Sequence, residues 1–95
     1  MDTPQNSYQQ NDIRKAKKIK VTHRKLGKEK AWGLANVAFN HIELDVTLKG
    51  RRHLLYLLHE CLHIIHPDWS ETKVVKVSRE MCKLLWEQNY RKVEN

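Results

Sequence analysis

Residues 51–66 combine a regular apolar pattern with two histidines that lie four positions apart. Leu58, Leu62 and Ile65 recur at the spacing of an α-helix, so one face of this segment is expected to be buried. Pro67 follows at once, and the residue before a proline disfavours helical geometry. The sequence therefore predicts a helix over about 51–66 that needs a core to pack against.

Three segments before this helix show the two-residue alternation of β-strands: 18–26, 31–39 and, most strictly, 41–48. The polar stretch 27–30 contains a glycine and predicts a hairpin turn between the first two strands. The apolar side chains expected to face the core from the last two strands are Trp32, Leu34, Val37, Ile42, Leu44, Val46 and Leu48.

A second helix is predicted over about 70–91, where apolar residues again follow the helical period. The expected fold class is α+β: a three-stranded antiparallel meander over about 18–48, packed on the first helix and on the C-terminal helix. A chain of 95 residues has room for one small core. We therefore expect a single minimal domain over 13–95, preceded by a flexible polar tail over 1–12.

The net charge of +7 is concentrated at the N-terminal end, where residues 1–30 carry nine of the 18 basic residues. The basic stretch 13–30 forms an N-terminal arm, which is either a solvated surface or a contact for nucleic acid or an acidic protein. It lacks interleaved aromatic residues, so base stacking is not indicated. The candidate contact residues are Arg14, Lys15, Lys17, Lys18, Lys20, Arg24 and Lys25.

The sequence has no apolar run of membrane-spanning length and no apolar N-terminal segment typical of a secretory signal. Cys61 and Cys82 both fall in apolar helical pattern and are interpreted as small core residues in a reducing compartment. We therefore expect a cytoplasmic protein without a membrane partner. The sequence does not predict an oligomeric state.

Residues 59–63 spell H-E-C-L-H, an H-E-x-x-H pattern. On a helix, His59 and His63 share one face with their Cβ atoms roughly 5–6 Å apart, and two imidazoles at this spacing can bind one Zn²⁺. Glu60 lies beside the first ligand, where it can act as a general base. On a mostly buried helix these polar groups need partners, so the sequence predicts a zinc site.

A third ligand is needed, and the sequence offers several. His66 lies seven residues after His59, about 10.5 Å along a helix, which disfavours a shared ion unless the last turn unwinds. Glu71 begins the second helix and is expected to fold back beside His63. It also stands three residues after Asp68, the spacing of a capping box, so ligand and helix cap remain alternatives. Glu80, further along the second helix, is another alternative.

The H-E-x-x-H pattern, together with the P-D-W-S-E ending at 67–71 and the strand at 41–48, resembles the small HExxH zincins of the gluzincin kind. It is most similar to short bacterial and phage members near the ImmA/IrrE and SprT-like groups. The resemblance implies Zn²⁺ bound by His59, His63 and Glu71, with Glu60 as general base. It also implies that the strand before the helix pairs with an extended peptide, through the segment that carries His41, Glu43 and Asp45.

Two functions from different classes follow. The first is a zinc-dependent metallopeptidase that hydrolyses a peptide or protein substrate with Glu60 as general base. The alternative is a zinc-stabilised, non-catalytic binding module whose basic arm contacts nucleic acid or an acidic protein. The two hypotheses differ in whether Glu60 has a chemical role.

Overall fold

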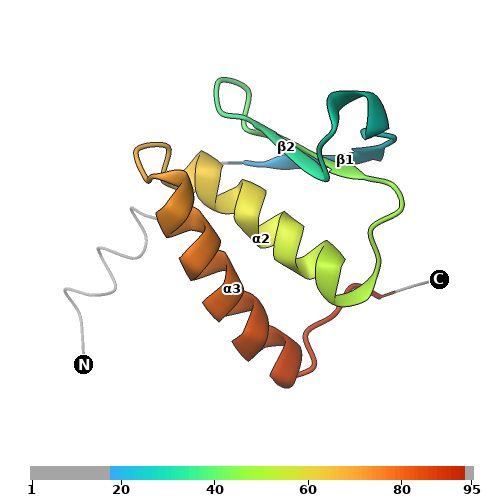
Figure 1. Cartoon of the computed structure of the whole chain (residues 1–95), viewed down its shortest axis with the longest axis vertical. Helices are drawn as coiled ribbons and strands as arrows, with labels where there is room; N and C mark the ends of the chain where they lie inside the picture. The colour runs from blue at the N-terminus through green and yellow to red at the C-terminus, as the bar shows by residue number, and fades with distance from the viewer. Residues whose placement is uncertain (1–17, 94–95) are drawn as a thin grey trace.

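The structure is a computed structural model that describes residues 18–93, and within that range it contains a three-stranded sheet and two α-helices. Figure 1 shows α2 lying between the sheet on one side and α3 on the other. This arrangement confirms the α+β class. The elements are β1 (Lys20–Arg24), the short 3₁₀ helix η1 (Gly27–Glu29), β2 (Gly33–Asn36), β3 (His41–Asp45), α2 (Gly50–Ile65) and α3 (Glu71–Glu87).

The sheet is mixed, so the predicted antiparallel meander is wrong. The strand order is β1-β3-β2. β3 is central; it pairs in parallel with β1 and antiparallel with β2. The first two strands therefore flank β3 on opposite sides and do not form a hairpin. The predicted tail over 1–12 and the first residues of the basic stretch, 13–17, lie outside the described residues.

Hydrogen bonds at the C-terminal end of β3 explain this topology. The Leu26 N–H donates to Asp45 Oδ1 at 2.8 Å, and the Asp45 N–H donates to the Trp32 carbonyl at 2.8 Å. The Val46 N–H donates to the Arg24 carbonyl at 3.0 Å. Both ends of the β1–β2 connection are thus attached to the end of β3. Leu26 is completely buried there, so the connection crosses the sheet end as η1 and does not form the predicted tight turn.

The core lies between the inner face of the sheet and α2. It is formed by Ile42, Leu44, Leu48 and Ile64, all buried, as the alternation in 41–48 predicts for the strand residues. Val46 is exposed instead, because β3 ends at Asp45.

The prediction for the second strand is wrong by one residue. Gly33 pairs with Leu44 and Ala35 with Ile42, so these small residues of β2 face α2. Leu34 lies on the opposite face, while Trp32 and Val37 are exposed. The one-residue shift exchanges the two faces of the strand. It leaves space between β2 and α2, which a side chain from α2 fills.

Both helices were predicted, with slightly different ends. α2 ends at Ile65, just before Pro67, and α3 ends at Glu87, earlier than the predicted 91. Cys61 and Cys82 are free thiols, half-buried and buried respectively. Neither of the two helices is long and apolar enough to cross a membrane.

Candidate metal centre

Two histidines of α2 form the first half of the site. His59 and His63 lie one turn apart, with their ring centroids 4.9 Å from each other and the rings nearly perpendicular. Both side chains are largely covered: 15% of His59 and 27% of His63 is exposed. The four-residue spacing therefore places both imidazoles on one face of the helix, as predicted, with both Nε2 atoms next to the same carboxylate.

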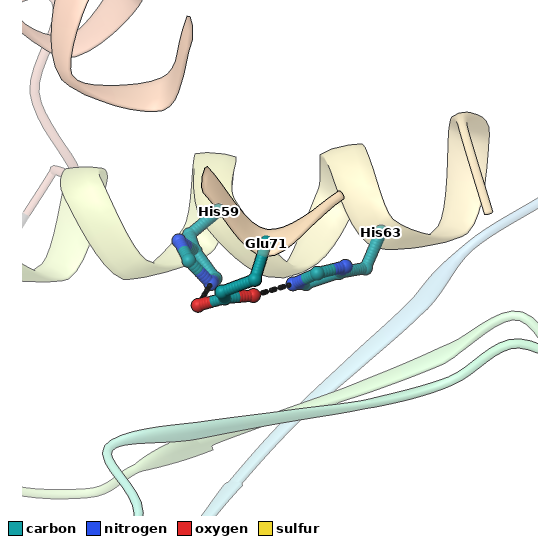
Figure 2. A group of neighbouring side chains, drawn as sticks. All are labelled: His59, His63 and Glu71. Carbon is teal, nitrogen blue, oxygen red and sulfur yellow. Dashed lines mark hydrogen bonds and ion pairs between the residues drawn. The ribbon is translucent and has the colours of Figure 1, made fainter. Parts of the chain in front are cut away.

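Glu71 completes the group from the first turn of α3. Figure 2 shows its carboxylate reaching both imidazoles, one with each oxygen. The His63 Nε2–H donates to Oε1 at 2.8 Å, and His59 Nε2 lies 3.2 Å from Oε2. Glu71 thus lies beside His63, as expected from the short turn between the two helices.

Ser70, and not Asp68, caps α3. Its Oγ accepts a hydrogen bond from the Lys73 N–H at 3.1 Å. Glu71 is then the first residue of the helix, and its side chain points to the histidines. The alternative of a capping box between Asp68 and Glu71 is therefore wrong, because the N-cap position is two residues later than that alternative requires. This leaves the Glu71 carboxylate available for the site.

The donor set fits a zinc ion. One ligand atom from each of His59, His63 and Glu71 lies within 4.8 Å of the other two. Two imidazole nitrogens and a carboxylate oxygen are common zinc ligands, and ligands at about 2.0–2.2 Å from a tetrahedral ion lie roughly 3.3 Å apart. Three protein ligands leave a fourth position for water or substrate, which is typical of a catalytic site.

Glu60 is buried between α2 and β2, with 7% of its surface exposed. Its carboxylate lies against Gly33, where a Cβ atom would come within 2.9 Å of Oε2. Burial raises the pKa of Glu60 to about 7, and the charge of Glu71 acts in the same direction, while His63 opposes it. A carboxyl group with a pKa near neutrality is suited to exchange protons at physiological pH.

Burial also lowers the pKa of His59, with the charge of Glu71 opposing the shift. A lowered pKa keeps the imidazole neutral, which is the form that binds a metal. The pKa of His59 is therefore lowered, as a metal ligand requires, and the pKa of Glu60 is raised, as a general base near neutral pH requires.

The two alternative ligands are not part of this group. His66 stacks on Trp69, with ring centroids 4.0 Å apart and planes within 4°. Lys73 lies over the same indole at 4.3 Å. Glu80 is exposed on α3 and does not belong to the His59, His63 and Glu71 cluster. His66 is thus stacked on the turn that follows α2 and lies outside the cluster.

The prediction that the strand carrying His41, Glu43 and Asp45 pairs with a peptide is wrong. β3 is the central strand, so its backbone groups already pair with β1 and β2. His41 is 2.8 Å from Thr22 Oγ1, and Glu43 accepts a hydrogen bond from Arg24 at 2.6 Å. Asp45 is buried and bonded to Leu26. These side chains lie on the sheet face opposite α2, and these contacts join them to β1 and to the segment that follows it.

The candidate contact residues of the basic stretch differ in their ion pairs and exposure. Arg24 forms ion pairs with Glu43 and Glu29, and these contacts raise its pKa further. Lys18, Lys20 and Lys25 are exposed. Arg14, Lys15 and Lys17 lie outside the described residues.

Sequence reasoning missed Gly33. Its signal was an isolated glycine in a strand pattern, which marks close approach by another group. It also missed a contact between His23 of β1 and His53 of α2, whose Nε2 atoms lie 2.9 Å apart. The rings stack with centroids 5.2 Å apart. This pair joins β1 to the first turn of α2.

Comparisons with protein-family models, with curated proteins and with solved structures find no match to this chain.

Proposed function

We propose that this protein is a small zinc-dependent metallopeptidase of the HExxH zincin class. The observation that carries the proposal is the contact of one carboxylate, that of Glu71, with both His59 and His63. The buried Glu60 lies on the same helix beside them. The proposed zinc ligands thus come from two neighbouring helices, and the proposed base comes from α2.

In the proposed reaction, the metal ligands and the general base have separate roles. His59, His63 and Glu71 would hold the zinc ion, which when bound would supply Lewis acidity for the scissile carbonyl and for the attacking water. The Glu60 carboxylate accepts a proton from that water and delivers it to the leaving amine. Burial against β2 holds Glu60 in place, and its pKa of about 7 allows both the uptake and the release of this proton.

The peptide is proposed to lie along β2. Within residues 18–93, β2 pairs only with β3, so its other edge offers unpaired backbone groups for an extended chain. Gly33 of β2 contacts Glu60. A peptide paired with this edge would therefore bring its backbone close to the general base.

Metal content and peptide hydrolysis test the proposal together. The wild-type protein is expected to contain about one zinc per chain after purification without chelators. His59→Ala, His63→Ala and Glu71→Ala are expected to lose it, whereas His66→Ala and Glu80→Ala, which lie outside the cluster, retain it. Equal zinc content in all five variants would contradict the ligand assignment.

Glu60→Gln separates the enzyme from the non-catalytic binding module. This variant keeps the shape of the side chain and removes its basicity, so it should retain zinc while cleavage of a peptide library falls by about 100-fold or more. If wild type and variant behave alike while loss of the basic residues abolishes partner binding, the binding module is the better description.

A further inference from the structure

A cavity of about 220 Å³ extends from the metal centre along the groove between α2 and α3. His59 and Glu71 form one end of it. Tyr56 on α2 and Val75 and Arg79 on α3 line the rest. The cavity thus continues from the proposed ligands by about two helical turns of α3, from Glu71 to Arg79.

Arg79 is the charged residue of this lining that is not a proposed ligand. Its side chain is exposed, and within residues 18–93 it has no carboxylate within ion-pair distance. Arg24, by contrast, is paired with both Glu29 and Glu43. An unpaired guanidinium beside a cavity can bind an anion without first breaking an internal ion pair.

The charge around the cavity favours an anionic ligand. The single negative charge of Glu71 would be more than offset by a doubly charged zinc ion, and Arg79 adds a further positive charge. A guanidinium binds a carboxylate through two parallel hydrogen bonds, which gives direction as well as attraction. A neutral or basic side chain would gain neither.

Resting on the proposed function, we propose that Arg79 is a specificity residue that binds a carboxylate of the peptide substrate beside the cleaved bond. The carboxylate belongs to an acidic side chain or to the C-terminus of the peptide. Both have the same chemistry, and matched peptides distinguish them.

The test compares Glu-containing peptides with their Gln counterparts, all with blocked C-termini, and neutral peptides with free and amidated C-termini. Wild type is expected to favour one of the carboxylate-bearing peptides. Loss of a charged hydrogen bond predicts that Arg79→Ala lowers kcat/KM for that peptide by about 10–100-fold, with little change for the neutral peptide. Arg79→Glu should shift the preference to Lys-containing peptides.

Lys76→Ala is the matched control, because Lys76 is an exposed cation on the same helix that does not line the cavity. It should keep the wild-type preference. Equal rates for all peptides with wild type, or a preference that survives Arg79→Ala, would overturn the inference.

Binding to the zinc-loaded Glu60→Gln variant, measured by calorimetry, separates this inference from the proposed function. Tighter binding of a carboxylate peptide that is lost on adding Arg79→Ala supports the site, even if wild type cleaves no peptide and the peptidase proposal fails. Cleavage by wild type together with equal binding of all peptides would keep the peptidase and reject the carboxylate site.

Discussion

Gly33 on β2 lies directly against the carboxylate of Glu60 on α2. A Cβ atom at residue 33 would stand 2.9 Å from both Cγ and Oε2 of Glu60. The sheet and α2 therefore meet at a point where only a hydrogen atom fits beside the proposed base. The position of Glu60 depends on this glycine as much as on the helix.

Gly33→Ala is expected to displace Glu60 or separate β2 from α2. Overpacking of this kind costs about 1–3 kcal/mol of unfolding free energy, which chemical denaturation measures. Peptide hydrolysis should fall as well. Gly27→Ala is the control, because a Cβ atom there meets nothing within 4 Å. If Gly33→Ala leaves the unfolding free energy unchanged, the close contact with Glu60 does not constrain this position. The same conclusion follows if the double variant with Glu60→Ala does not regain the lost stability.

The raised pKa of Glu60 predicts a pH-dependent stability of the zinc-free protein. The folded-state pKa is about 7 and the ordinary value is 4.5, so the folded state holds this proton more tightly than the unfolded state. The stabilisation is complete below about pH 4.5 and is lost as the pH rises through about 7. A shift of this size corresponds to roughly 3 kcal/mol.

Glu60→Gln isolates this effect. The lowered pKa of His59 acts in the opposite direction, since burial favours its neutral form and stability then rises with pH. Because both proteins contain His59, the difference between them reports on Glu60. In the presence of a chelator, wild type should lose stability relative to Glu60→Gln between pH 5 and pH 8. A constant difference across this range would exclude a buried, protonated Glu60.

Zinc should raise the melting temperature. An ion that binds only the folded state stabilises it by about 2.7 kcal/mol when its concentration is 100 times Kd. For a domain of this size that corresponds to a shift of about 10 °C or more, which differential scanning fluorimetry detects. A chelator should reverse the shift, and His63→Ala should reduce it. His66→Ala should behave as wild type, because His66 stacks on Trp69 and not on the ligands.

Ser70→Ala should weaken both α3 and the metal site. Loss of the hydrogen bond from the Lys73 N–H to Ser70 Oγ is expected to lower the unfolding free energy by about 1 kcal/mol. Fraying of the first turn would also loosen Glu71, so zinc affinity should fall with it. Ser70→Asn, which retains a capping oxygen, should restore both quantities. A stable variant with unchanged zinc affinity would indicate that Glu71 is positioned by the histidines alone.

The sequence by itself determined the two helices, a strand that starts at His41 and the pair of histidines. These features depend on local periodicity, on the stop imposed by Pro67 and on the four-residue spacing of His59 and His63. All of them act within a few residues of the chain. The arrival of Glu71 beside His63 could also be expected, because a short turn brings the start of one helix to the end of the other.

Only the tertiary structure decided the sheet order, the faces of β2 and the environment of Glu60. The central place of β3 depends on hydrogen bonds between Asp45 and residues up to 19 positions away. The contact of Gly33 with Glu60 spans 27 positions of sequence. Such contacts form only when the chain closes on itself, and no local pattern encodes the distance or the burial that raises the pKa of Glu60.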